Sequence, residues 1–193
     1  PEGWEKKSAF DVMDILNGGT PKTKIREYWD GNIPFFTPKD KTESIYVLDT
    51  EKTLTEYGLK HCSSKLYSKD TIFITARGTV GKVNLALRDM AMNQSCYALK
   101  AKQPLNQYFL YFALRESIEH IEAKAVGSVF DAIIKDTFKA IPFIIPSPML
   151  IQSYTDSIIP VVRQIGNLMI QNQKLSQARD LLLPRLMNGE ITV

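Results

Sequence analysis

The chain has 193 residues, of which 44% are hydrophobic and 23% are charged, and its formal net charge is +3. These values are ordinary for a folded protein of one domain with an extension, or of two small domains. No apolar run reaches the roughly 20 residues that a membrane-spanning helix needs, so we expect no membrane partner. The mild basicity permits a nucleic-acid partner without requiring one.

The two cysteines, Cys62 and Cys96, stand alone in the sequence. Neither belongs to a Cys-x-x-Cys pair, which argues against a zinc site and against thioredoxin-type chemistry. Isolated cysteines are typical of a reducing compartment, so we expect a cytoplasmic protein. The chain begins at Pro1 without an initiator Met or a signal pattern, which indicates a start at a domain boundary inside a longer natural protein.

Frequent Gly and Pro residues interrupt the first 146 residues, which is typical of many short strands joined by turns. The expected strands are residues 67–75, 83–87, 95–99 and 141–148. One helix is expected at 106–124, where large apolar residues recur near helical spacing. The pattern therefore predicts a mixed α/β domain.

The composition changes at Ser147 and Pro148, which suit the N-cap and the first position of a helix. The apolar residues that follow fall on a 3-4 repeat, as in a coiled coil. One seam position holds Ile151, Ile158, Ile165, Asn172 and Arg179, and the other holds Tyr154, Val161, Leu168, Leu175 and Leu182. A helix of about 35 residues is about 52 Å long, too long for a domain of this size to cover. We therefore expect the helix to project and its seam to need a partner.

Two residues of this helix have specific expected effects. Asn172 lies in the seam, where a polar residue weakens pairing but fixes its register. Pro160 lies off the seam and removes one backbone hydrogen bond, so we expect a kink there. The alternative is an amphipathic helix that lies along its own domain. The predicted fold class is α+β, with a globular domain over 1–147 and a long helix with its tail over 148–193.

Motifs for catalysis were tested and do not fit. Residues 78–82 (GTVGK) lack the first Gly and the final Ser or Thr of a phosphate-binding loop. Glu122 and Lys124 have the Glu-x-Lys spacing of Mg²⁺-dependent nucleases, but they follow a helical stretch rather than a strand. His61 and Cys62 are adjacent, so they cannot easily face each other as base and nucleophile. We predict no catalytic residue and no metal ligand.

Basic and amide side chains near the turns form a better pattern. Lys and Arg supply phosphate contacts in DNA complexes, while Asn, Gln and Arg read base edges. Loops on a rigid scaffold are where such contacts usually lie. The predicted DNA-binding residues are Lys22, Lys24, Arg26, Lys39, Lys41, Arg77, Thr79, Lys82, Asn93 and Gln94.

Several motifs, taken together and in order, resemble the target recognition domain of specificity (S) subunits of type I restriction–modification systems. They are residues 18–21 (GGTP), 28–40 (YWDGNIPFFTPKD), 75–81 (TARGTVG), 93–94 (NQ), 127–130 (GSVF) and 179–191 (RDLLLPRLMNGEI). The resemblance covers nearly the whole chain. It implies a protein that reads one half of a split DNA target, while modification (M) and restriction (R) subunits perform methylation and cleavage.

The resemblance also implies a role for the helix. In this family two long helices pack antiparallel, hold two recognition domains apart and dock the M subunits. This chain has one such domain and one such helix, so it is either the C-terminal half of a full subunit or a half-subunit that works as a dimer. The absent Met and the Leu-rich tail favour the C-terminal half. S-adenosylmethionine, ATP and Mg²⁺ are expected only in the partner subunits.

Two other functions remain open from the sequence. The first is a Mg²⁺-dependent nuclease that uses Glu122 and Lys124. The second is an assembly protein whose globular domain binds protein rather than DNA. The sequence contains no Asn/Asp-Pro-Pro-Tyr/Phe methyltransferase motif, which argues against methyl transfer by this chain itself.

Overall fold

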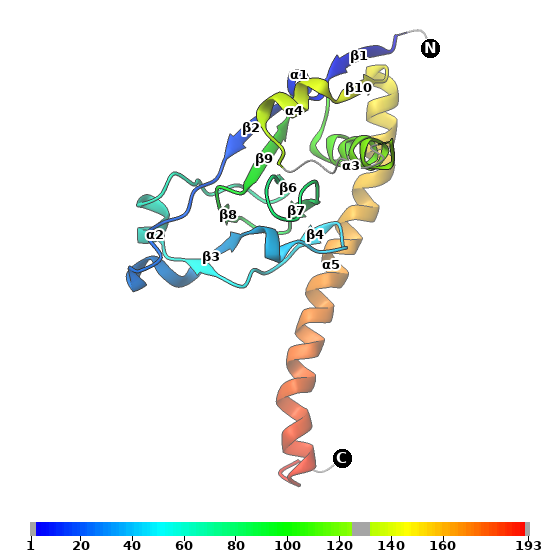
Figure 1. Ribbon diagram of the computed structural model, residues 1–193. Coiled ribbons are helices and arrows are strands. Elements are labelled where there is room, and N and C mark those ends of the chain that lie inside the picture. Colours follow the sequence, from blue (N-terminus) through cyan, green and yellow to red (C-terminus); the bar gives the residue numbers. More distant parts are fainter. Residues whose placement is uncertain (1–2, 125–131, 192–193) are drawn as a thin grey trace.

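A five-stranded sheet lies at the centre of the fold (Figure 1). The computed structural model describes residues 3–124 and 132–191. The strands, in spatial order, are β2 (Met13–Asn17), β9 (Cys96–Ala101), β6 (Ile72–Thr75), β7 (Val83–Ala86) and β4 (Tyr46–Val47). The short edge strand β4 runs parallel to β7, and the other neighbours are antiparallel. Non-consecutive strands therefore lie side by side through most of the sheet.

Both faces of this sheet are buried, because successive side chains of a strand point to opposite faces. In β6, Ile72 and Ile74 belong to one hydrophobic cluster and Phe73 belongs to another. Every residue of β6 and β7 is buried. The sheet thus separates two hydrophobic cores, one on each side.

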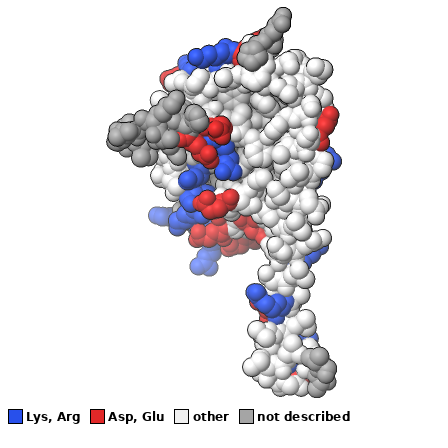
Figure 2. Space-filling model, turned by 90° about the vertical axis from the view of Figure 1, so that its right-hand side faces the viewer, with Lys and Arg blue, Asp and Glu red and all other residues white. Residues whose placement is uncertain are grey.

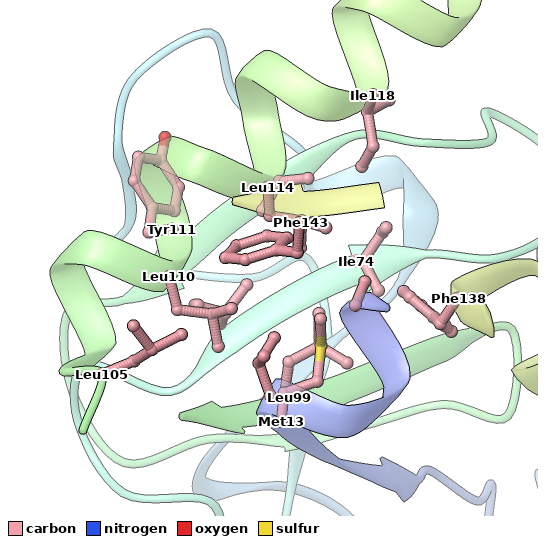
Figure 3. Packing of buried hydrophobic residues seen from close by; sticks show 14 of the residues in the cluster. Met13, Ile74, Leu99, Leu105, Leu110, Tyr111, Leu114, Ile118, Phe138 and Phe143 are labelled. Atoms are coloured by element: carbon pink, nitrogen blue, oxygen red, sulfur yellow. The ribbon is translucent and has the colours of Figure 1, made fainter. Parts of the chain in front are cut away.

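Helices cover the first face (Figure 3). Leu99 and Ile74 of the sheet meet Leu110 and Leu114 of α3 (Gln107–Lys124) in the same buried cluster. The short helix α1 (Ala9–Val12) contributes Ala9 and Val12 to this cluster. The apolar spacing that predicts the helix at 106–124 therefore reflects a real buried face of α3.

The second face is covered by a three-stranded sheet in the order β5 (Thr53–Leu54), β3 (Trp29–Phe36) and β8 (Ala91–Met92). Phe36 of β3 and Phe73 of β6 stack with their ring centroids 5.0 Å apart, which joins the two sheets. Two short 3₁₀ turns flank β3, η1 (Arg26–Tyr28) before it and η2 (Pro38–Asp40) after it. Helix α2 (Glu56–Lys60) follows β5 on the side of the domain away from the long helix (Figure 1).

The beginning of the chain lies beside the segment that precedes the long helix. Strand β1 (Glu5–Ser8) pairs antiparallel with β10 (Pro142–Ile145), which follows the short helix α4 (Lys135–Ala140). The backbone N–H of Ala9 also donates to the carbonyl of Ile141 at 2.9 Å. This pairing closes the globular domain immediately before the long helix begins.

The long helix, α5 (Pro148–Met187), begins as predicted, with Ser147 as its N-cap residue and Pro148 at its first position. Its first half packs on the domain through the buried residues Ile151, Thr155, Val162 and Gly166. From residue 174 to 190 every residue is exposed, and this end projects away from the domain (Figure 1). Both predictions for the helix are therefore partly right, because it lies along its own domain first and projects afterwards.

The structure changes three sequence predictions, which concern one strand, one seam residue and the prolines of the long helix. The strand expected at 67–75 is shorter, because residues 68–71 form a turn in which Asp70 adopts a φ of 66°. Ile151 belongs to the domain core, with 3% exposure, rather than to a free seam. The helix continues through Pro160 and Pro184 without a break. None of the described helices is both long and apolar enough to cross a membrane.

Candidate nucleic-acid interface

A hollow of about 460 Å³ opens where several loops meet beside β3. Four of the ten predicted DNA-binding residues line it: Lys39, Arg77, Asn93 and Gln94. They come from three separate segments, the turn η2, the loop after β6 and the turn between β8 and β9. The fold therefore brings together residues that are up to 55 positions apart (39 to 94) in the sequence.

Glycines allow two of these loops to touch. A Cβ atom on Gly18 would lie 2.0 Å from the carbonyl oxygen of Asn93, so only glycine fits at this position. The neighbouring Gly19 donates its backbone N–H to the Met92 carbonyl at 3.0 Å. The Asn93 N–H in turn donates to the Phe36 carbonyl at 2.9 Å. The Gly18–Gly19 turn, the Asn93 turn and the end of β3 are thus held as one unit.

The amide side chains on this unit have defined partners. The hydroxyl of Thr20 donates a hydrogen bond to Oε1 of Gln94. Oδ1 of Asn93 accepts the backbone N–H of Ser95 at 3.0 Å. Gln94 is exposed, so its amide nitrogen remains accessible to a partner. A polar side chain that is already held loses less conformational entropy when it binds.

Arg77 reaches the hollow from the loop between β6 and β7. The N–H groups of Ala76 and Arg77 both donate to the Ser95 carbonyl, at 2.8 and 3.3 Å. The loop then turns through Gly78 and Gly81, which have φ values of 79° and 81°. L-residues with side chains rarely adopt such values, which explains the paired glycines that superficially resemble a phosphate loop.

Lys39 is positioned by a carboxylate that has a structural role. Asp40 accepts the N–H and the hydroxyl of Thr37 at 2.8 and 2.7 Å, and the N–H of Glu51 at 2.7 Å. These bonds fix η2 and attach it to the loop before β5. The side chain of the exposed Lys39 is left at the rim, and no described residue forms an ion pair with Lys39 or Arg77.

Two aromatic residues that line the hollow, Trp29 and Phe35, were not predicted from the sequence. The rings of Trp29 and Phe35 meet edge to face, with centroids 5.5 Å apart. The indole N–H of Trp29 donates to the Lys22 carbonyl at 3.4 Å, and the Lys52 ammonium lies 5.6 Å from the ring centroid. Alternation along β3 was the available signal, because residues 29, 33 and 35 are apolar and lie on the same face.

The remaining predicted DNA-binding residues lie outside the hollow. Lys22, Lys24 and Arg26 are exposed on the adjoining loop, next to Thr23, which lines the hollow. Thr79 is exposed in the 77–82 turn, and Lys41 is half-buried after η2. Lys82 lines a separate crevice of about 120 Å³ with Glu43, Arg115 and Glu119. Lys82 is therefore not part of the hollow.

The two rows of the predicted seam have different surroundings along α5. One row is exposed: Val161, Leu168, Leu175 and Leu182 show 45–67% of their surface. The other row faces the domain in its first turns, since Ile151 is buried in the core and Ile158 packs against it. Tyr154, the first member of the exposed row, also contacts the domain, with its ring centroid 5.7 Å from that of Phe109. Ile165 is half-buried, and Asn172 is exposed.

The surface on the α5 side carries few charged side chains, including much of the projecting end (Figure 2). An exposed apolar row on a mostly uncharged face is typical of a protein contact surface.

The residues considered for catalysis have other roles or lie on the wrong element. Glu122 and Lys124 belong to the last turn of α3, not to a strand. His61 stacks on Tyr28 at 5.3 Å, and its Nδ1 lies 2.8 Å from the Tyr57 carbonyl. Burial, with a smaller contribution from the charge of Asp40, raises the pKa of the Cys96 thiol to about 12, so this thiol is a poor nucleophile. Residues 127–130, which carry one motif of the resemblance, lie outside the described residues.

Sequence comparison places the chain among known proteins. Residues 1–158 match the family described as type I restriction modification DNA specificity domain. The chain is 32% identical to the MjaIX specificity subunit of Methanocaldococcus jannaschii, covering 82% of this chain and 39% of that protein. It is 28% identical to the HindI specificity subunit of Haemophilus influenzae, covering 99% of this chain and 42% of that protein. The chain thus spans less than half the length of these relatives.

Solved structures show the same fold. The HsdS subunit from Thermoanaerobacter tengcongensis aligns with a TM-score of 0.60 and 18% identity, covering 99% of this chain and 46% of that one. The S subunit from M. genitalium aligns with a TM-score of 0.60 and 23% identity, covering 95% of this chain and 45% of that one. With the family match over most of its length, this chain belongs to the type I restriction modification DNA specificity domain family.

Proposed function

We propose that this chain is a non-catalytic DNA-reading module that recognises one half of a bipartite target in a type I restriction–modification enzyme. Residues 1–147 are the reading domain, and residues 148–193 form the helix and its tail. The observation that carries the proposal is the hollow, where Lys39, Arg77, Asn93 and Gln94 converge from separate segments. These side chains combine the phosphate-binding and base-reading chemistries that DNA recognition uses. Family membership supports the same function.

The interface extends beyond the hollow. Specific DNA interfaces bury on the order of 1,000 Å² or more of protein surface, which is larger than one hollow provides. The exposed Lys22, Lys24 and Arg26 adjoin it through Thr23 and Trp29. We assign these three cations to phosphate contacts beside the hollow. Lys41 and Thr79 are assigned to the rim, whereas Lys82 faces a different crevice and serves as a control position.

The long helix is the spacer and the docking element. Its exposed row of Val161, Leu168, Leu175 and Leu182 pairs antiparallel with the helix of the other half of a longer chain or of a second copy. The same region docks M subunits, and R subunits join the assembly. A solved structure with the same fold is described as showing complex assembly of the type I system, which supports this role. The protein works in the cytoplasm, in keeping with its two isolated cysteines.

The chain requires no cofactor of its own in this proposal. S-adenosylmethionine, ATP and Mg²⁺ act in the partner subunits. A nuclease based on Glu122 and Lys124 is disfavoured because both residues belong to a helix rather than to a strand. An assembly protein that binds no DNA is disfavoured by the mixed cationic and amide lining of the hollow.

A binding experiment tests the proposal. Methylation-site sequencing of the host, with and without the gene, gives the target sequence. The chain, alone and with its M subunits, is then titrated onto this duplex by fluorescence anisotropy. Arg77→Ala is expected to weaken binding about tenfold or more, because a good base contact provides about 1–3 kcal/mol. Lys39→Ala is expected to lower the salt slope of binding by about one, as for a lost phosphate contact.

Lys82→Ala is the matched control, since it removes one exposed cation outside the hollow. Its affinity should stay within about twofold of the unsubstituted chain. If Lys82→Ala weakens binding as much as Arg77→Ala, the hollow is not the interface. Methyl transfer from S-adenosylmethionine by the chain alone would refute a non-catalytic role. Metal-dependent cleavage that disappears in Glu122→Ala would establish the nuclease instead.

A further inference from the structure

We propose that the residues around the hollow beside β3 read a guanine in the major groove, and that Arg77 and Asn93 share its two acceptors. The proposal rests on the function proposed above, because it takes DNA as the partner. It goes further by naming the base. It also gives the neighbouring amides, Asn93 and Gln94, a role that differs from the adenine contact their residue types suggest.

An amide side chain reads adenine with both of its ends. Its oxygen accepts from the N6 amine while its nitrogen donates to N7, and this bidentate pair is the usual contact of Asn and Gln with a base. An amide whose oxygen is turned away to bond within the protein does not supply this pair. Guanine presents two adjacent acceptors, N7 and O6, so a donor alone can bind it. The state of the amide oxygens therefore decides between the two purines.

The oxygen of Asn93 is turned back into its own turn. Oδ1 accepts the backbone N–H of Ser95 at 3.0 Å, two residues along the chain. A backbone N–H can only donate, so this contact fixes which end of the amide is the oxygen. No described residue accepts a hydrogen bond from Nδ2, and no buried side-chain nitrogen or oxygen of the described residues lacks a partner. Nδ2 is therefore accessible, and Asn93 offers the hollow that it lines a donor.

The neighbouring amide has the same arrangement. The Thr20 hydroxyl donates to Oε1 of Gln94, so the oxygen is engaged. Gln94 is exposed, and no described residue accepts a hydrogen bond from its Nε2. Two neighbouring amides thus have their oxygens bonded within the protein and leave their nitrogens to a partner.

The guanidinium of Arg77 adds further donors beside these amides. The backbone N–H of Arg77 donates to the Ser95 carbonyl at 3.3 Å, and the N–H of the same Ser95 binds Asn93. Arg77 and Asn93 are therefore both attached to one residue, and both line the hollow. Arg77 is exposed and forms no ion pair with a described residue, so its donors are available. Arg bound to O6 and N7 is the commonest specific contact to guanine.

The two carboxylates of the lining fit the same base pair. Asp40 uses both oxygens within the protein: Oδ2 accepts the N–H and the hydroxyl of Thr37, and Oδ1 accepts the N–H of Glu51 at 2.7 Å. Glu51 itself is exposed and keeps an acceptor at the rim. A G·C pair carries one major-groove donor, the cytosine N4 amine, and Glu or Asp is the side chain that accepts from it. The lining therefore has donors for guanine and a carboxylate for its partner cytosine.

Purine analogues test the assignment with the full chain and its M subunits. Each guanine and adenine of the recognised half-site is replaced in turn by its 7-deaza analogue, which keeps Watson–Crick pairing and removes the N7 acceptor. At one guanine this change should weaken binding about tenfold, as expected for the loss of a good base contact. In Arg77→Ala the same analogue should weaken binding by about twofold or less, because most of the contact is already lost.

Exchanging a donor for an acceptor tests the role of the amides. Asn93→Asp keeps an oxygen for the Ser95 N–H, since Asp forms the same kind of turn, and it replaces Nδ2 with an acceptor. The preference for G·C over C·G at the guanine position should fall about tenfold, because a carboxylate accepts from cytosine and is repelled by the guanine acceptors. Thermal unfolding checks that the turn is kept. Gln94→Glu makes the same exchange without altering this turn and should lower the preference for G·C at this or the adjacent pair.

Lys82→Gln is the matched control, because it makes the same change of net charge outside the hollow. It should leave the preference for G·C over C·G unchanged. A similar loss of preference in Lys82→Gln and Asn93→Asp would show that net charge, rather than the exchanged donor, is responsible, and it would overturn the role given to Asn93.

The other outcomes separate this proposal from the proposed function. Sequence-specific binding that is weakened by 7-deazaadenine and by no 7-deazaguanine would overturn the guanine assignment and leave DNA reading intact. Equal weakening of target and unrelated DNA by Asn93→Asp, with the G·C preference unchanged, would place Asn93 beside a phosphate and would also overturn the assignment. Binding to no duplex at all, with or without M subunits, would overturn the DNA-reading function itself.

Discussion

The side chain of Gln173, in α5, donates a hydrogen bond to the carboxylate of Asp49, in the loop after β4. The same carboxylate forms an ion pair with Arg88. Beyond Gln173 the helix is exposed, so this contact marks the point at which it leaves the domain. Glu51 and Lys52, two and three residues after Asp49, line the hollow. One short loop therefore contacts both the helix and the proposed reading site.

Replacing Asp49 with Ala should loosen the helix where it leaves the domain. The free energy of unfolding should fall by about 1 kcal/mol, since partly exposed hydrogen bonds and surface ion pairs each contribute little. Urea denaturation measures this change, and hydrogen exchange should speed up in α5 near residue 170. The exposed Lys174 provides a control, because Lys174→Ala removes a neighbouring side chain that forms no hydrogen bond or ion pair with the described residues. Equal exchange in both variants would show that Asp49 does not anchor the helix.

Gly166 sets how closely α5 approaches the sheet. A Cβ atom at this position would lie 2.9 Å from Cδ1 of Leu87 and 3.5 Å from Cε2 of Tyr46, and both residues are buried. Gly166→Leu should therefore lower the free energy of unfolding by about 1–3 kcal/mol through overpacking, despite the better helix propensity of Leu. Thermal unfolding, followed by circular dichroism, measures this loss of stability. The adjacent, exposed Asn167→Leu should change stability by less than about 0.5 kcal/mol.

The exposed row of α5 should control association. Leu168 and Leu175 are 45% and 67% exposed and lie seven residues apart on one face. Replacing both with Asp should convert a dimer of the chain into a monomer, and it should weaken M-subunit docking, because charges cannot be buried in an apolar seam. Sedimentation velocity gives the oligomeric state.

Asn167 and Lys174 each precede one of these leucines by one position and are also seven residues apart. The variant with Asp at both of these positions is therefore the matched control. Retention of the dimer by the Leu168/Leu175 variant would show that the pairing surface lies elsewhere.

The two thiols should differ in reactivity. Cys96 is 1% exposed, and burial followed by the nearby Asp40 charge raises its pKa to about 12. A raised pKa keeps the thiol protonated, and hence unreactive, until the pH rises towards that value. At pH 8 the folded chain should react with Ellman's reagent at one cysteine, the half-buried Cys62, and the unfolded chain should react at two. Cys62→Ser should abolish the native reaction, and rapid labelling of Cys96 in that variant would contradict its burial.

The sequence by itself determined the local elements. Apolar residues near the helical spacing of 3.6 predicted α3, and the Ser147–Pro148 pair predicted where α5 begins. The heptad spacing of apolar residues predicted that α5 is too long for its domain to cover. These features depend on neighbouring residues, so they can be read along the chain. The strand at 67–75 was predicted too long because the turn at Asp70 depends partly on a distant partner, the Tyr46 hydroxyl 2.8 Å from its carboxylate.

The tertiary structure alone decided which residues meet. Lys39, Arg77 and Gln94 line one hollow and Lys82 does not, although the sequence ranks them alike. Trp29 and Phe35 line this hollow only because β3 lies beside loops that come from distant parts of the chain. In α5 packing divided the predicted seam: Ile151 and Ile158 pack on the domain, whereas the row through Leu168 and Leu175 stays exposed. Contacts between distant segments depend on the geometry of the whole fold, and no local pattern records them.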